Sequence, residues 1–258
     1  MSNIETSSNA IEVKELVKRF RIHHKLGGSL KRAILSLGRG EGTVETFVAL
    51  KGISFKIPHG QTVGVIGKNG SGKSTLLSLL ARVYLPSEGE VTISSRSGVR
   101  PRVAPLLELG AGFHPELTGY ENIAFYGAVL GMTALDLEQL TPSIVEFAEL
   151  DGKVDTRLHG WNDGAKLRLG FSIAVHTNPD ILLVDEVLAV GDEAFQNKCF
   201  HRIAGLQEQG KTIVFISHDL PVVEKVANRV LWLHNGELRM DGETSEVLKA
   251  YKSDSGSL

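Results

Sequence analysis

The residues best suited to chemistry form a glycine-rich run that ends in lysine and serine. Gly67–Ser74 reads GKNGSGKS and fits the pattern G-x-x-x-x-G-K-[ST]. The backbone amides of such a loop surround phosphate oxygens, and a helix that begins at the lysine directs its positive dipole end at them. We expect Lys73 to bridge the β- and γ-phosphates and Ser74 to hold Mg²⁺. The residues predicted to bind nucleotide are Gly67, Lys68, Asn69, Gly70, Ser71, Gly72, Lys73, Ser74 and Thr75.

Phosphate binding is common to kinases, GTPases and ATPases, and a second group of residues separates them. Asp185 and Glu186 follow the apolar run Ile181–Val184, which places both carboxylates at the sheet edge where ligands bind in open α/β folds. We expect Asp185 to hold Mg²⁺, directly or through water, and Glu186 to act as the general base on the attacking water. His218 follows another strand-like run, Thr212–Ser217. We expect this histidine to contact the γ-phosphate and respond to its loss.

These groups need a scaffold, and the hydrophobic pattern predicts one. Short β-branched runs alternate with longer helical patterns, which is typical of an α/β fold with a mostly parallel, buried core sheet. Strands are predicted at 48–58, 61–66, 89–94, 181–184, 212–217, 229–234 and 237–240. The first reads as an antiparallel edge strand, and the last two read as a hairpin. Residues 119–175 are mostly helical and predict an inserted helical subdomain, and 21–47 form a second insertion.

The composition excludes several classes of protein. The chain has 258 residues, 42% of them hydrophobic and 22% charged, which is ordinary for a globular protein. Its formal charge of -2 provides no basic field for nucleic-acid binding. Because Cys199 is the single cysteine, no internal disulfide forms, and the cytosol is the expected compartment. The N-terminus lacks the features of a secretion signal and the apolar runs are strand-sized, so we expect no membrane span.

The motifs, taken in order, resemble the nucleotide-binding subunit of an ABC transporter over nearly the whole chain. GKNGSGKST, ILLVDE and ISHD carry this resemblance. The runs LLELGAGFHPELTGYENI at 106–123 and VDEVLAVGDEAFQNKC at 184–199 resemble a narrower group, the ATPase subunits that drive export of lipid-linked O-antigen, capsular polysaccharide or teichoic acid in bacteria. The segment GSLKRAIL within 21–47 also resembles this group.

The resemblance implies one P-loop ABC ATPase domain over 1–258, without a C-terminal carbohydrate-binding domain. It implies ATP and Mg²⁺ as cofactors and a homodimer that works with an integral membrane permease, itself in two copies. The lipid-linked glycan is then contacted indirectly, and nucleic acid is not a partner. The implied location is the cytoplasmic face of the bacterial inner (plasma) membrane, as a peripheral subunit.

Individual roles also follow from the resemblance. Phe20 matches the aromatic residue that stacks on adenine, and Phe47 is the competing candidate. Glu108 lies near the position of the glutamine that senses Mg²⁺ in most ABC subunits, and its carboxylate would bind the metal more strongly than an amide. Asp192 falls in the loop that touches the opposite subunit. The segment Gly110–Tyr126 is expected to transmit closure to the permease.

The signature sequence departs from the family pattern. It is normally close to Leu-Ser-Gly-Gly-Gln and here reads WNDGA over 161–165. In ABC proteins its serine and glycine meet the γ-phosphate bound on the other subunit, so Asn162, Asp163 and Gly164 take that role. Asn162 can donate through its amide, but the Asp163 carboxylate would repel a triphosphate and, as an N-cap, would occupy the helix amides. We expect weaker ATP-driven closure unless the Asp163 side chain turns away from the site.

Two alternatives stay open. A nucleotide-gated subunit with weak hydrolysis would explain the altered signature, although Glu186 and His218 are both present. A soluble ABC ATPase that acts outside transport would carry two cassettes or a long coiled coil between its motifs, and the chain has neither. The basic segment Leu30–Leu37, with Lys31 and Arg32, would contact anionic lipid headgroups or the lipid-linked substrate at the membrane surface, or form a solvated surface excursion.

Overall fold

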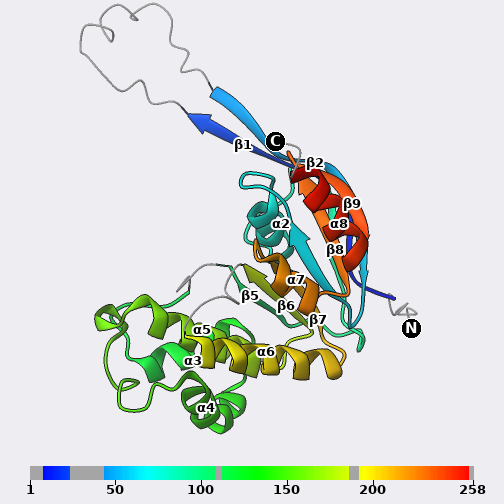
Figure 1. The fold of residues 1–258 in the computed structure, drawn as a ribbon. Coiled ribbons are helices and arrows are strands. Elements are labelled where there is room, and N and C mark those ends of the chain that lie inside the picture. Colours follow the sequence, from blue (N-terminus) through cyan, green and yellow to red (C-terminus); the bar gives the residue numbers. More distant parts are fainter. Residues whose placement is uncertain (1–7, 24–43, 108–111, 186–191, 256–258) are drawn as a thin grey trace, which may run out of the picture.

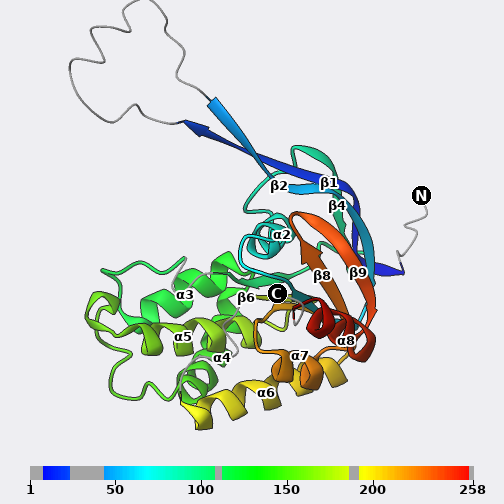
Figure 2. The ribbon, with the colours of Figure 1, turned by 45° about the horizontal axis from the view of Figure 1, so that its top comes forward.

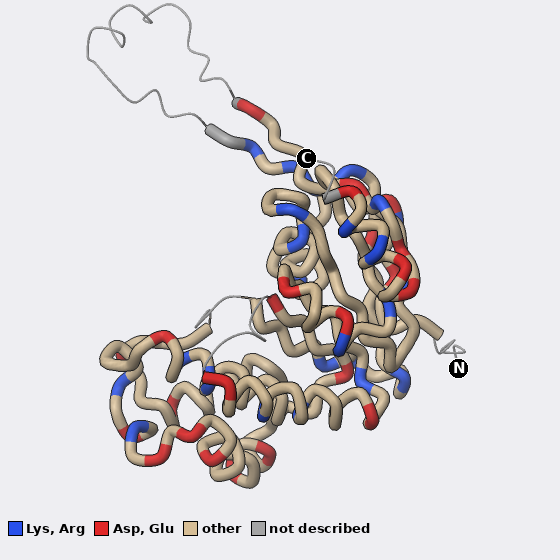
Figure 3. Tube along the Cα trace, viewed as in Figure 1, with Lys and Arg blue, Asp and Glu red and all other residues tan. Residues whose placement is uncertain are grey.

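The computed structural model describes residues 8–23, 44–107, 112–185 and 192–255. The predicted site residues Glu108 and Glu186, and residues 24–43 of the 21–47 insertion, lie outside these ranges. The described chain forms two sheets and a lobe of helices at one side (Figure 1), and the lobe shares a hydrophobic core with the larger sheet. Lys/Arg and Asp/Glu are interspersed over both parts (Figure 3), in line with the small net charge.

A six-stranded sheet has the order β5-β6-β7-β3-β8-β9. Its strands are β3 (Thr62–Ile66), β5 (Val103–Leu106), β6 (Ile181–Asp185), β7 (Thr212–Ile216), β8 (Arg229–His234) and β9 (Glu237–Glu243). The first five in spatial order are mutually parallel, and β9 pairs antiparallel with β8. All residues of β3 and β7 are buried, as expected of parallel strands covered on both faces. The predicted α/β class and parallel core are confirmed.

A second, antiparallel sheet has the order β2-β1-β4. Its strands are β1 (Asn9–His23), β2 (Val44–Pro58) and β4 (Glu88–Ile93). β2 is the predicted edge strand, but β1 was not predicted from the sequence. The reason is a register shift between Val13 and Leu16, with Glu15 in the left-handed region at φ 44°, which interrupts the period-2 pattern of apolar residues. The far ends of β1 and β2 form a two-stranded arm that projects from the body (Figures 1 and 2).

The helices occupy two places. They are α2 (Lys73–Leu80), α3 (Gly119–Val129), α4 (Ala134–Ala148), α5 (Asp163–His176), α6 (Glu193–Glu208), α7 (Leu220–Val226) and α8 (Thr244–Ser255), with a short 3₁₀ turn at Leu158–Gly160. α3, α4 and α5 form the separate lobe, with α6 beside them (Figure 2). Capping boxes at Thr118 and Thr133 begin α3 and α4. The lobe confirms the predicted helical insertion between strands.

Packing explains the position of α2. Its leucines at 76, 77, 79 and 80 are all buried, and they share one core with residues of both sheets, among them Ile11, Leu50 and Val214. The helix that follows the phosphate loop is therefore held from both sheets. Among the described residues, no helix is long and apolar enough to span a membrane.

Candidate nucleotide site

The glycine-rich loop connects the end of β3 to the start of α2. Gly72 is the N-cap of α2, in the left-handed region at φ 103°, and no side chain caps the helix. A Cβ at Gly72 would lie 2.7 Å from the Ala49 carbonyl oxygen, and one at Gly67 would lie 2.2 Å from that of Leu233. Glycine is therefore required by backbone packing at both positions. The uncapped helix N-terminus is an anion-binding feature.

Lys73 sits inside this loop. Its ammonium donates hydrogen bonds to the carbonyl oxygens of Gly67 at 2.8 Å and Lys68 at 3.2 Å, and the residue is only 7% exposed. The nearly buried ammonium and the positive end of the α2 dipole both attract negative charge, so together they favour binding of an anion at this loop. The structure thus places the predicted phosphate-binding charge in the loop.

The turn between β8 and β9 supports the loop from behind. The Gly236 amide donates to the Ser71 carbonyl oxygen at 3.1 Å, and the Gly236 carbonyl oxygen accepts from the Lys51 amide at 2.9 Å. The Asn235-Gly236 hairpin was predicted, and both residues have the positive φ of such a turn. Its support of the loop was missed, because no local pattern reports a contact between residues so distant in the chain.

A cleft of about 280 Å³ opens beside the loop. It is lined by Phe47, Ala49, Asn69, Gly70, Gly72, Lys73, Ser74 and Thr75. Six of the nine predicted nucleotide-binding residues therefore face one cleft. Phe47, from β2, is 49% exposed there, and its ring offers an apolar face for a flat base.

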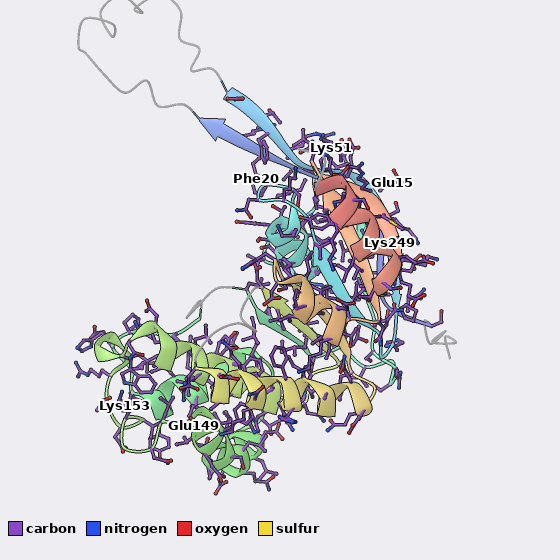
Figure 4. The ribbon with its side chains drawn as sticks, viewed as in Figure 1. Glu15, Phe20, Lys51, Glu149, Lys153 and Lys249 are labelled. Carbon is purple, nitrogen blue, oxygen red and sulfur yellow. The ribbon has the colours of Figure 1, made fainter. Side chains whose placement is uncertain are left out.

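Phe20 occupies a different position. It is the cross-strand neighbour of Phe47, but its ring packs edge-on against Tyr84, with the ring centroids 5.4 Å apart. The Lys18 ammonium lies 5.0 Å from the Phe20 centroid. Tyr84 follows the C-terminal end of α2, whereas the phosphate loop precedes the N-terminal end. Phe20, at the base of the arm (Figure 4), is absent from the cleft lining, whereas Phe47 is part of it, so this geometry favours Phe47 of the two candidates for the base contact.

The acidic residue and the histidine lie at the same sheet edge as the loop. Asp185 ends β6, is partly buried, and pairs in register with Ile216 at the end of β7. His218 follows β7 and is exposed. Because β7 lies between β6 and β3, the carboxyl ends of three parallel strands bring the loop, Asp185 and His218 to one edge.

The donor atoms suit Mg²⁺ bound together with phosphate. Asp185 supplies a carboxylate and Ser74 a hydroxyl, on two elements that contact each other, β6 and α2. Mg²⁺ usually takes one or two carboxylates with phosphate oxygens and water. Within the described ranges, no cluster of three or more His, Cys, Asp or Glu residues could hold a metal ion by itself.

The signature residues begin α5, in the helical lobe. Asn162 is the N-cap, and its side-chain oxygen accepts from the Ala165 amide at 2.8 Å. Asp163 is the first helical residue, with its side chain 86% exposed and 3.5 Å from the Lys166 ammonium. The concern that Asp163 caps the helix is therefore corrected, since Asn162 does so. The amides of Asp163 and Gly164 precede the first intrahelical hydrogen bond, which Lys166 donates to Asn162.

Asp192 begins α6. Its side chain accepts from the Phe195 amide at 2.9 Å as an N-cap, and its other oxygen lies 2.6 Å from Arg168 of α5. The Phe195 amide, with the Arg168 guanidinium, holds the pKa of the Asp192 carboxyl below its usual range. The sequence did not indicate this link between α5 and α6, because neither residue belongs to a pattern that names its partner.

Known proteins share these features. A family model described as "ABC transporter" matches residues 50–189. The O-antigen export system ATP-binding protein RfbB of Klebsiella pneumoniae is 39% identical over 244 residues, covering 94% of this chain and 97% of that protein. RfbB of Myxococcus xanthus is 40% identical over 251 residues, covering 95% and 56% of the two chains. The teichoic acids export ATP-binding protein TagH of Shouchella clausii is 45% identical over 206 residues, covering 80% and 55%.

The chain thus spans little more than half of the Myxococcus and Shouchella proteins. Among solved structures, the ATP-binding subunit of an ABC transporter aligns with a TM-score of 0.74 at 20% identity, covering 94% of this chain and 93% of that one. A dimeric ATP-binding cassette, MJ0796 bound to ADP and Pi, aligns with a TM-score of 0.72 at 22% identity, covering 91% and 98%. The chain belongs to the ABC transporter family and, within it, to the ATP-binding subunits related to O-antigen and teichoic acid export proteins.

Proposed function

We propose that this protein hydrolyses ATP to power export of a lipid-linked polysaccharide through a separate membrane subunit. The observation that carries the ATPase proposal is the convergence of the phosphate loop, Asp185 and His218 at one sheet edge. The names of the relatives support the substrate class, which comprises O-antigen and teichoic acid. The proposed location is the cytoplasmic face of the bacterial inner membrane, as a peripheral subunit.

The residues divide the work of phosphoryl transfer. The loop amides and Lys73 bind the phosphates, and Phe47 packs against the base. Ser74 and Asp185 would hold Mg²⁺, which neutralises charge on the β- and γ-phosphates when bound. Glu186 and Glu108 lie outside the described residues, and we propose them as the general base and an additional metal contact. His218 contacts the γ-phosphate, so that the site responds when that group leaves.

The complete site requires a second copy of the chain. Residues 161–165 do not line the cleft beside the phosphate loop. The Asn162 side chain caps the Ala165 amide, and the amides of Asp163 and Gly164 precede the first intrahelical hydrogen bond of α5, so they can meet a phosphate at this helix N-terminus. We propose that α5 of one subunit meets the γ-phosphate bound on the other. Two ATP molecules then hold a homodimer closed, and hydrolysis lets it open.

A second cleft fits the membrane partner. It has a volume of about 530 Å³ and lies between the end of α2, β5 and the end of α3, with Arg82, Arg100 and Arg102 among its lining residues. Val129 in this lining is exposed, as are Val83, Tyr84, Leu85 and Val99, which lie next to or within three residues of lining residues in the chain. Exposed apolar groups around a basic cleft are typical of a protein interface. We propose that a cytosolic segment of the permease, apolar with an acidic residue, docks there. The segment Gly110–Tyr126, expected to transmit closure, begins outside the described residues.

The decisive measurement is steady-state ATPase activity of the purified subunit, alone and in complex with its membrane permease. Wild type should hydrolyse ATP and Lys73→Met should lose about a thousandfold in kcat, because the buried charge on the phosphates is removed. If wild type shows only the activity of Lys73→Met in both preparations, hydrolysis is refuted and the nucleotide-gated alternative remains.

A second experiment tests the docking site. Val129→Asp should abolish co-purification with the permease while ATPase of the isolated subunit persists, and retention of the complex would refute the docking site.

A further inference from the structure

One side chain joins three helices of the lobe at a point outside the nucleotide cleft. The two terminal nitrogens of Arg168, on α5, bind different carboxylates: Nη1 lies 2.7 Å from Glu149 Oε2 and Nη2 lies 2.6 Å from Asp192 Oδ2. Glu149 ends α4 and Asp192 begins α6. The central guanidinium carbon is 4.6 Å from the centroid of the Phe195 ring.

This arrangement fixes Arg168 in one orientation. Its side chain is only 18% exposed, and the planar fork bonds two carboxylates while its face packs on an aromatic ring, a combination that lysine does not reproduce. Glu149 is held as well, because its other oxygen lies 3.3 Å from the Lys198 ammonium. Figure 4 shows Glu149 within the helical lobe. The ion pairs of Arg168 with Glu149 and Asp192, and of Glu149 with Lys198, are short and partly screened from solvent, and they share Arg168 and Glu149.

The position of Arg168 in the chain connects its contacts with Glu149, Asp192 and Phe195 to the proposed dimeric site. Arg168 stands on the helix that begins at Asn162, so it moves with the signature residues. Asp192 lies seven residues after Asp185, the proposed metal ligand at the end of β6. A rigid contact between Arg168 and Asp192 therefore fixes the start of α6 relative to the signature helix.

We infer that Arg168 is a positioning residue for ATP hydrolysis. It holds Asp192 against the signature helix, so that both enter the composite site in a fixed relation when two subunits close. This inference rests on the proposed dimeric site and adds a residue to it. It concerns the hydrolytic step, since nucleotide binding to one subunit uses the phosphate loop in the other part of the molecule.

Asp192 offers a way to separate positioning from folding. Its Oδ1 caps α6 by accepting from the Phe195 amide, whereas Oδ2 faces Arg168. Asp192→Asn keeps a good N-cap acceptor and removes the charge that binds Arg168, since asparagine and aspartate cap equally well. Glu149→Gln removes the same charge on the other side of Arg168 and serves as the matched comparison.

The experiment measures ATPase kinetics, binding of a fluorescent ATP analogue to the isolated subunit, and thermal unfolding. We expect Asp192→Asn and Arg168→Met to lower kcat by about tenfold or more with KM and analogue affinity within about twofold of wild type. Arg168→Lys should recover only part of the rate. Because the two groups act as a unit, the double variant should be no slower than Arg168→Met.

Two controls make the result specific. Glu149→Gln should keep kcat within about twofold. Arg239→Met removes another arginine that pairs with a carboxylate, Asp254 at 2.8 Å, and lies over an aromatic ring, Trp232 at 4.4 Å, and it should leave kcat unchanged. Equal losses in Asp192→Asn and Glu149→Gln, or losses that follow a lowered Tm, would overturn positioning in favour of general stabilisation. Wild-type kcat in Asp192→Asn would also overturn it, whereas a wild type without Lys73-dependent ATPase would overturn the proposed function instead.

Discussion

Gly164→Ala should change stability and activity in opposite directions. Gly164 is the second residue of α5, and a Cβ there would meet only Asn162 Oδ1 at 3.6 Å, an ordinary contact. Alanine is favoured over glycine by roughly 0.8–1.0 kcal/mol in a helix interior, and by less in the first turn. We therefore expect the free energy of unfolding of the single chain to rise by about 0.5 kcal/mol, which corresponds to about 1–2 °C in Tm.

The ATPase rate should fall. In the proposed dimer, the amides at the start of α5 approach the γ-phosphate bound on the partner, and a methyl group at Gly164 stands between them. Loss of one hydrogen bond to a charged group costs about 1.5–3 kcal/mol, which is about 10- to 160-fold in kcat. The assay is steady-state ATPase at saturating ATP, with Tm from thermal unfolding of the same samples.

Gly170→Ala is the matched control, because Gly170 lies in the same helix and its Cβ would meet Phe113 at an ordinary 3.6 Å. It should gain stability and keep wild-type turnover. The reasoning is refuted if Gly164→Ala turns over ATP at the wild-type rate, since the helix N-terminus then does not approach phosphate. A fall in Tm for Gly164→Ala would refute the stability part, because it would reveal a steric requirement within the chain itself.

Three other outcomes follow from the site. Phe47→Ala should raise KM for ATP by about tenfold through loss of base stacking, whereas Phe20→Ala should leave KM within about twofold; the reverse order would return Phe20 to the base site. Asp163→Ser should raise ATPase by removing like-charge repulsion, and rates equal within about twofold would show that repulsion is absent. The Cys199 thiol should not react with a thiol reagent at pH 8, because burial raises its pKa to about 12 and keeps it protonated; rapid labelling before denaturation would contradict this.

Local patterns were sufficient wherever a group and its support are adjacent in the chain. The phosphate loop was predicted because a buried strand, a glycine run and a helix follow one another directly from Thr62 to Leu80. Asp185 and His218 were predicted for the same reason, since each ends or follows an apolar strand. The hairpin at Asn235-Gly236 also depends on two neighbouring residues with positive φ.

Sequence patterns did not predict the features that depend on contact between segments distant in the chain or on the exact backbone conformation. β1 was missed because Glu15, with its left-handed φ, shifts the apolar face of the strand. The choice between Phe20 and Phe47 depends on which end of α2 each ring reaches, and both have equivalent local sequence contexts. The capping role at α5 was assigned to Asp163, yet backbone conformation gives it to Asn162, one residue earlier.

The sequence by itself determined the family, the α/β class and the chemistry of the phosphate loop, because these depend on residue types at short, regular spacing. Only the tertiary structure decided that Phe47 faces the cleft, that Gly236 supports the loop from behind, and that Arg168 joins Glu149 to Asp192. Each of these is a contact between segments that are far apart in the chain. Such contacts are set by the packing of whole sheets and helices, which leaves no periodic signal in either segment alone.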